Sequence, residues 1–213
     1  IILLPAGTPD RSGGILGLRC CYVTSSYPLH RMGQEIVLVN RNDEAVGVGE
    51  KETVHRTGQL HRAFSVFVFD ASGRLLLQQR AEDKYHSGGL WSNTCCSHPG
   101  PGQSIEASAR RRLREEMGFS CDLRPVFGFV YEAQLDNGLV EHEYDHVLIG
   151  NYSGEVQPNP AEVAGWKWMD PEEVVRELQV NEAQYTYWFK IAFERLLASP
   201  PGEMEVESLS SYD

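Results

Sequence analysis

The sequence lacks any run of apolar residues long enough to cross a membrane. A spanning helix needs roughly 20 mostly apolar residues. The opening apolar run, Ile1 to Leu4, is also too short for the core of a signal peptide. We therefore expect a soluble protein with no membrane partner.

Cysteine is scarce, and its arrangement excludes a small secreted scaffold. The chain has five cysteines, at Cys20, Cys21, Cys95, Cys96 and Cys121. This odd number does not resemble an evenly paired disulfide framework. We expect reduced thiols and a cytoplasmic location.

Positive charge is in deficit as well. The formal net charge is -11 and the sequence pI is about 5.1. Binding a nucleic-acid backbone requires clustered Lys and Arg, so no nucleic-acid partner is expected. An anionic small-molecule ligand would need a local basic pocket, and we expect the chain to act as a monomer or weak homodimer.

The 213 residues, 41% of them hydrophobic, are enough for one well-buried domain. Residues 1–31, rich in Gly, Pro and Ser, predict a poorly ordered leader or N-terminal extension, with an ordered arm or targeting peptide as the alternative. Residues 32–199 predict the folded domain, with Met32 a candidate natural start. Residues 200–213 predict an acidic polar tail.

Short apolar runs separated by turn residues predict a mixed sheet. The strands are expected near 35–40, 46–50, 62–70, 74–80, 125–134 and 141–151. Helices are expected at 104–118, from Pro171 onward, and at 182–198. This pattern predicts the α/β class, with helices packed on the sheet of a single domain.

Two glutamates in one predicted strand suggest a metal site. Glu141 and Glu143 are two residues apart, so their carboxylates project from the same face. A solvated edge strand would also explain an isolated pair. His55, His61 and His98 lie at the edges of predicted elements, and mixed nitrogen and oxygen ligands suit a first-row divalent ion more than calcium.

The helix at 104–118 contains Arg111-Arg-Leu-Arg-Glu-Glu-Met-Gly118, which resembles part of the Nudix box. In that motif, clustered glutamates hold magnesium against a diphosphate. Glu115 and Glu116 match it. Ser97, Gln103 and Arg112 stand where the motif has Gly, Glu and Glu, so the resemblance implies the fold and weakens the case for hydrolysis.

Four further motifs make the resemblance specific. They are His61-Arg-Ala-Phe-Ser-Val-Phe67, Leu75-Leu-Leu-Gln-Gln-Arg80, Trp91-Ser-Asn-Thr-Cys-Cys-Ser-His-Pro99 and Glu141-His-Glu143. Over about residues 36–197 the chain resembles the type I isopentenyl diphosphate isomerases. That family implies a Nudix-like α/β/α sandwich with a mixed sheet, and interconversion of isopentenyl and dimethylallyl diphosphates in isoprenoid biosynthesis.

The resemblance implies a catalytic set. Cys96 matches the family's catalytic thiol and Cys95 a structural neighbour, although two adjacent cysteines alone would suggest inert packing or a vicinal disulfide. Glu143 is expected on the opposite side of the five-carbon unit, with Tyr131 as its hydrogen-bonded relay. Trp188 is expected to stabilise a carbocation through its indole face, although a core aromatic is the alternative.

The resemblance also implies ligands for the metals and the diphosphate. One divalent ion (Mn, Mg or Zn) is expected at His55, His61, His98, Glu141 and Glu143. A magnesium ion bound with the substrate is expected at Glu116 and the backbone carbonyl of Cys96. The diphosphate of isopentenyl diphosphate is expected at Lys51, Arg80, Lys84 and Arg112.

Two other functions remain open alongside the isomerase. A Nudix diphosphate hydrolase would use the same fold, but it lacks box carboxylates and leaves Cys96 and Trp188 without a role. A non-catalytic Nudix-like binding protein would not need Cys96, Glu143 and Tyr131 together. The isomerase accounts for all of these residues.

Overall fold

The computed structural model describes residues 34–198, which belong to one compact unit. The expectations for residues 1–31 and 200–213 lie outside this range. The elements are β1 (Glu35–Val39), β2 (Ala45–Glu50), α1 (Lys51–Thr57), β3 (His61–Phe69), β4 (Leu75–Arg80), β5 (Trp91–Ser92), β6 (Cys95–Ser97), α2 (Ile105–Met117), β7 (Leu123–Gln134), a 3-10 turn (Asp136–Gly138), β8 (Val140–Asn151), β9 (Val163–Met169), α3 (Pro171–Asn181), a 3-10 turn (Glu182–Gln184) and α4 (Tyr187–Ala198).

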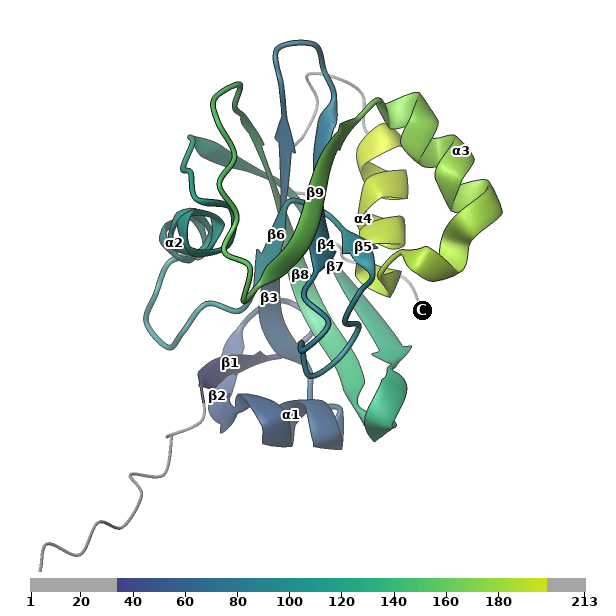
Figure 1. Ribbon diagram of the computed structural model, residues 1–213. Helices are drawn as coiled ribbons and strands as arrows, with labels where there is room; N and C mark the ends of the chain where they lie inside the picture. The colour runs from purple at the N-terminus through teal and green to yellow at the C-terminus, as the bar shows by residue number, and fades with distance from the viewer. Residues whose placement is uncertain (1–33, 199–213) are drawn as a thin grey trace, which may run out of the picture. The chain divides into compact units, whose positions relative to one another are not determined.

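The strands form one mixed sheet in which β3 has the most neighbours. It pairs in parallel with β8 over nine residues, from His61 with Glu143 to Phe69 with Asn151. It pairs antiparallel with β1, β4 and β6. The strand pairs β7 with β8 and β4 with β9 extend the sheet in antiparallel fashion (Figure 1). The mixed sheet predicted from the sequence is confirmed.

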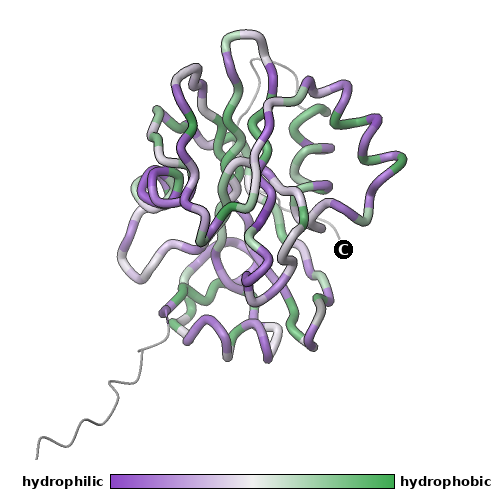
Figure 2. Tube along the Cα trace, in the orientation of Figure 1, coloured by the Kyte–Doolittle hydropathy of each residue, from purple (hydrophilic) through white to green (hydrophobic). Residues whose placement is uncertain are grey.

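Helices cover both faces of the sheet, as Figure 1 shows, with α2 on one side and α3 and α4 on the other. Alternate residues of β3 supply the two cores because successive side chains in a strand point to opposite faces. Phe67 packs in the core beneath α3 and α4, whereas Phe64 and Val66 pack in the core beneath α2. Figure 2 shows the central strands as the most hydrophobic part of the trace. The layers are those of the predicted α/β/α sandwich.

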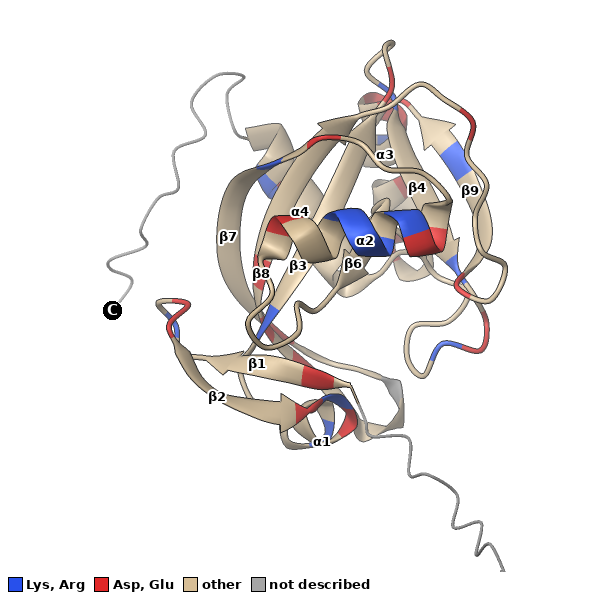
Figure 3. Ribbon diagram, turned by 90° about the vertical axis from the view of Figure 1, so that its left-hand side faces the viewer, with Lys and Arg blue, Asp and Glu red and all other residues tan. Residues whose placement is uncertain are grey.

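Helix α2 begins and ends at local sequence signals. The hydroxyl of Ser104 accepts a hydrogen bond from the Ala107 N–H (3.2 Å) at its N-terminus. Gly118 ends it with φ of 79°, and a Cβ there would lie 2.2 Å from the Gln157 carbonyl oxygen. In Figure 3, the ribbon of α2 carries several positions coloured blue for Lys or Arg. The predicted helix and its glycine cap are confirmed.

Other elements differ from the prediction. The short α1, with the sequence KETVHRT, was not predicted, and neither were β5, β6 and β9. The predicted helix at 182–198 is interrupted before α4 because Tyr185 forms a bridge with Trp91 and the Thr186 N–H donates to the Trp91 carbonyl (2.9 Å). No helix within residues 34–198 is long and apolar enough to cross a membrane.

Candidate active site

Three histidines and a glutamate bring their donor atoms together at one buried point. The Nε2 atom of His98 lies 3.2 Å from Nε2 of His61 and 2.9 Å from Oε1 of Glu143. His61 Nε2 lies 3.4 Å from the same oxygen. With His55, these residues form a set whose donor atoms all lie within 4.8 Å of one another. The structure therefore brings together four of the five residues expected to bind one ion.

Backbone contacts orient two of these histidine rings. The Nδ1 atom of His55 bonds to the Lys51 carbonyl (2.7 Å), and Nδ1 of His61 bonds to the Gln59 carbonyl (2.8 Å). Metal-binding histidines commonly hold the second ring nitrogen in this way. Nε2 of His55 is buried and has no hydrogen-bond partner among residues 34–198. The donor set and this unpartnered nitrogen fit a divalent metal ion.

The sheet and α1 determine the positions of these donors. His61 begins β3 and pairs in register with Glu143 on the parallel strand β8. His98 follows β6, which also pairs with β3. His55 comes from the last turn of α1, which Glu50 caps by accepting hydrogen bonds from the Glu52 and Thr53 N–H groups. Residues far apart in the sequence are thus fixed around one point.

Glu141 and Glu143 share one tyrosine. The Tyr131 hydroxyl lies 2.6 Å from Oε2 of Glu143 and 3.1 Å from Oε2 of Glu141. Burial and the neighbouring Glu143 charge raise the pKa of Glu141 well above its usual value. Burial acts in the same direction on Glu143, but hydrogen bonds to His61 and His98 outweigh it and hold its pKa well below the usual value. The pKa values of the two carboxyls are thus shifted in opposite directions.

His86 also reaches this site, although sequence reasoning did not identify it. Its Nε2 lies 3.5 Å from Oε1 of Glu141. The donors of His55, His86 and Glu141 form a second set within 4.8 Å of one another. Burial and the Arg80 charge lower the pKa of His86 to about 2, so its imidazole is neutral. His86 follows Lys84 and Tyr85 in an irregular segment, where no periodic pattern could have identified it.

The adjacent cysteines face opposite cores. Cys95 packs beneath α2, and partly buried Cys96 packs against the core beneath α4 that contains Tyr131 and Trp188. Burial raises the pKa of Cys96 to about 12 even though the Arg80 charge lowers it. Both thiols are free in the structure. Cys96 therefore presents a neutral S–H to the same side of the sheet as the Tyr131 hydroxyl.

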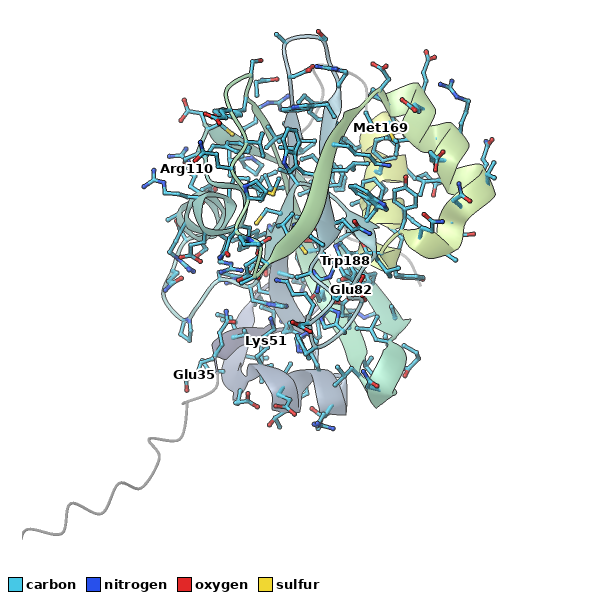
Figure 4. The ribbon with its side chains drawn as sticks, viewed as in Figure 1. Glu35, Lys51, Glu82, Arg110, Met169 and Trp188 are labelled. Carbon is cyan, nitrogen blue, oxygen red and sulfur yellow. The ribbon has the colours of Figure 1, made fainter. Side chains whose placement is uncertain are left out.

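Asn93 fixes the orientation of Trp188 and was not predicted. Its Oδ1 accepts hydrogen bonds from the Trp188 indole N–H (3.2 Å) and the Ser92 hydroxyl (2.9 Å). Its Nδ2 donates to the carbonyls of Cys95 (2.7 Å) and Val66 (3.2 Å). One buried amide therefore links the aromatic ring to the strand that carries the thiol. In Figure 4, Trp188 lies near the middle of the molecule at the start of α4.

Arg80 connects several parts of the site. Its Nη1 lies 3.8 Å from Sγ of Cys96, and its guanidinium lies 5.3 Å from the centre of the Trp188 ring. Its Nη2 and Nε donate to the carbonyls of His86 (3.2 Å) and Ser87 (3.1 Å). Its side chain is thus held between the thiol, the indole and the segment that carries His86.

The remaining predicted cations lie in two places. Lys51 lines a cleft of about 470 Å³ together with Tyr85, over whose ring its Nζ lies at 5.2 Å. Lys84 and Arg112 both contact Glu162, Arg112 with an N–O distance of 3.1 Å. Sequence reasoning did not identify this shared carboxylate.

Glu116 comes from α2, on the other face of the sheet from α4. Its Oε1 pairs with Nη2 of Arg112 (2.6 Å), and its Oε2 accepts from Nε2 of Gln78 (3.1 Å). The pKa of Arg112 is raised by Glu116, against the opposing effect of burial. Glu115 also pairs with Arg112 (2.6 Å), so both retained Nudix-box carboxylates contact the arginine that replaces another.

The comparisons with known proteins agree with this fold. The NUDIX domain sequence profile matches residues 59–189. A curated isopentenyl-diphosphate Delta-isomerase of Burkholderia multivorans is 51% identical over 77% of this chain and 93% of its own length. The corresponding isomerase of Pectobacterium atrosepticum is 50% identical over 76% and 90%, and that of Nocardia farcinica is 48% identical over 75% and 92%.

Solved structures agree on the fold alone. A Deinococcus radiodurans protein superposes with a TM-score of 0.63 at 20% identity, covering 76% of this chain and 98% of its own. A MutT NUDIX hydrolase from Burkholderia pseudomallei gives 0.53 at 19% identity, covering 65% and 98%. The sequence matches are far closer and span most of both chains, so this chain belongs to the isopentenyl-diphosphate Delta-isomerase family of the NUDIX superfamily.

Proposed function

We propose that this chain is an isomerase that interconverts isopentenyl and dimethylallyl diphosphates in isoprenoid biosynthesis. One observation carries the mechanism: a neutral thiol, Cys96, and a buried hydroxyl–carboxylate pair, Tyr131 with Glu143, face the same core, which also contains Trp188. Family membership supports the reaction, and this arrangement supports the roles of the residues.

Acid and base act on different carbons. In the direction from isopentenyl diphosphate, a proton is added to the terminal methylene carbon, which leaves tertiary carbocation character at the branched carbon. Loss of a proton from the neighbouring methylene then forms the new double bond. Glu143, acting through Tyr131, takes one of these two roles, and Cys96 takes the other. The proton donor and the proton acceptor exchange when the direction of the reaction reverses.

Trp188 stabilises the cation-like state. An indole face attracts a desolvated cation by about 2 kcal/mol or more. Its ring is almost completely buried, and Asn93 fixes its orientation. This burial keeps bulk water from the indole ring itself.

The cations of the site bind the diphosphate. Arg80 lies between Cys96 and Trp188, which would place a phosphate next to the reacting carbons. Lys51, Lys84 and Arg112 complete the set. Arg112 stands where the Nudix box has a glutamate, so a cation replaces a metal-binding carboxylate and favours binding over hydrolysis.

Two divalent ions are part of the proposal. His55, His61, His98, Glu141 and Glu143 would hold a manganese, magnesium or zinc ion, whose positive charge increases the acidity of the adjacent carboxyl. Glu116 and the Cys96 carbonyl would hold a magnesium ion with the diphosphate. The small-molecule substrate, a monomer or weak homodimer, and a cytoplasmic location with reduced thiols also belong to the proposal.

The test is NMR of isopentenyl diphosphate in deuterated water with the metal-loaded enzyme. The wild type should form dimethylallyl diphosphate that contains deuterium. Cys96→Ala and Glu143→Gln should not. Cys121→Ala changes a partly buried cysteine outside the site and serves as the matched control.

Other outcomes identify the alternatives. Released phosphate or a monophosphate would identify a Nudix hydrolase. Diphosphate binding without turnover or deuterium exchange would identify a binding protein. Either result would overturn the isomerase.

A further inference from the structure

His86 approaches the proposed metal site from a segment that contains none of the proposed metal ligands. This segment, residues 81–90, joins β4 to β5. The His86 ring packs edge-on against Tyr85 (4.4 Å between centroids) and Trp188 (6.0 Å). Its Nε2 faces Glu141 rather than solvent, and the residue is 6% exposed.

The segment is fixed in this position by its own contacts. Arg80 binds the carbonyls of His86 and Ser87, and the Gly89 N–H donates to the Arg80 carbonyl (3.0 Å). A Cβ at Gly88 would lie 2.4 Å from the Glu82 carbonyl oxygen, so the backbone packs too closely there for any other residue. The location of His86 is therefore built into the fold.

The ring of His86 is oriented like those of His55 and His61, whereas Nδ1 of His98 has no hydrogen-bond partner among the described residues. Nδ1 of His86 lies 3.3 Å from the Ser87 hydroxyl, which leaves Nε2 to face the site. His55 and His61 likewise use Nδ1 for a backbone carbonyl and direct Nε2 inward. His55 belongs to both donor sets, and its Nε2 has no hydrogen-bond partner among the described residues.

The spacing suits bonds to one ion. With metal–ligand bonds of about 2.1 Å, neighbouring donors are about 3 Å apart and opposite donors about 4 Å apart. Nε2 of His86 and Oε1 of Glu141 are 3.5 Å apart, and the contacts among His61, His98 and Glu143 are 2.9 to 3.4 Å. The contacts within each set therefore have the spacing of a coordination shell, and His55 belongs to both sets. The 4.8 Å limit holds within each set and not for all six donors together, so binding of one ion by both sets requires their donors to move closer together.

We propose that His86 is a further ligand of the divalent metal. The inference rests on the metal site of the proposed function and extends it. One ion would bind six side chains, His55, His61, His86, His98, Glu141 and Glu143. A shell filled by protein has no position for substrate, so the ion would act on the acidity of Glu143 without touching the isoprenoid.

Four imidazoles also have a consequence for metal choice. Magnesium prefers oxygen ligands and retains water, whereas manganese and zinc accept imidazole readily. The site would therefore discriminate against magnesium, which would remain available for the diphosphate.

The test measures metal binding without substrate. Manganese is titrated into the metal-free full chain and the free ion is followed by EPR, for the wild type, His86→Gln and the control His146→Gln. His146 bonds to Asp43 and lies outside both donor sets. We expect one ion per chain, with affinity at least tenfold lower in His86→Gln and unchanged in the control.

Affinity alone would not separate a ligand from a residue that only orients Glu141, because loss of either weakens binding. X-ray absorption of the manganese-loaded protein counts the coordinated imidazoles. Four in the wild type and three in His86→Gln would support the inference. Three in the wild type would overturn it whether or not the variant folds, while leaving the isomerase intact. No manganese binding by the wild type would overturn the proposed metal site as well.

Discussion

Replacing Asn93 by alanine should destabilise the protein and slow catalysis through Trp188. The Asn93 amide makes four buried hydrogen bonds. Ser92 retains a second partner in Thr186 at 2.9 Å, so three groups lose a bond: two carbonyls and the indole N–H. At about 1–3 kcal/mol for each unsatisfied buried group, and with some relaxation, we expect a loss of about 3–5 kcal/mol. Urea unfolding monitored by circular dichroism measures it.

The catalytic effect requires a separate measurement. We expect kcat to fall at least about tenfold in Asn93→Ala because Trp188 loses the bond that orients its face. Trp188→Phe keeps an aromatic face but removes the N–H. In that background, Asn93→Ala should lower kcat much less than in the wild type, since the contact is already absent.

Two results would refute this reasoning. A change in unfolding free energy below about 1 kcal/mol would mean that the carbonyls and the indole find other partners. An equal fall in kcat in both backgrounds would mean that Asn93 does not act through Trp188. Ser92→Ala, which removes only one of the four bonds, is the matched control for both measurements.

Three further predictions concern other parts of the structure. Arg80→Lys should raise KM for isopentenyl diphosphate about 10–100-fold, because an ammonium group cannot bind two carbonyls and also lie over the Trp188 ring as a planar guanidinium does. Steady-state kinetics measure this change. An unchanged KM would contradict the prediction. Because the pKa of Cys96 is raised to about 12, little of this thiol is ionised at pH 8, and its alkylation by iodoacetamide should be roughly a thousandfold slower than that of free cysteine. The alkylation rate should rise tenfold per pH unit. A rate that reaches a plateau below pH 10 would contradict this prediction. Burial raises the pKa of Asp43, but hydrogen bonds from His146 and Arg62 outweigh it and lower the pKa below its usual value. The carboxylate therefore stabilises the fold above its unfolded pKa, and this contribution is lost as pH falls through the lower folded pKa. Asp43→Asn should cost about 1 kcal/mol of unfolding free energy at pH 7 and progressively less as pH falls through that range, and a pH-independent cost would refute this.

Local signals explain which elements could be predicted. Helix α2 has a serine at its start and a glycine in the left-handed conformation at its end, so its bounds follow from the sequence. The long strands β3 and β8 were predicted from apolar runs. Helix α1 has only seven residues, mostly polar, with Val54 and His55 buried against the rest of the domain. Tertiary contacts stabilise such a helix, so no periodic pattern marks it.

The same distinction applies to the site. Glu141 and Glu143 were predicted to share a face because strand alternation requires it. His86 and Asn93 were missed because their positions depend on a segment with left-handed residues, Ser87 and Gly89, and on strands of two or three residues. The roles of Cys96 and Trp188 came from family resemblance, since the residues alone suggested inert packing.

The parallel pairing of β3 with β8 links folding to chemistry. A shift of one residue would turn Glu141, Glu143 and Asp145 away from His61 and toward the core beneath α2. Only the native register assembles the donor set, so an ion bound there would favour correctly paired chains and stabilise them by mass action. Refolding with manganese should then give a higher yield of native protein than refolding with a chelator, because only chains with the native register of β3 and β8 would bind the ion.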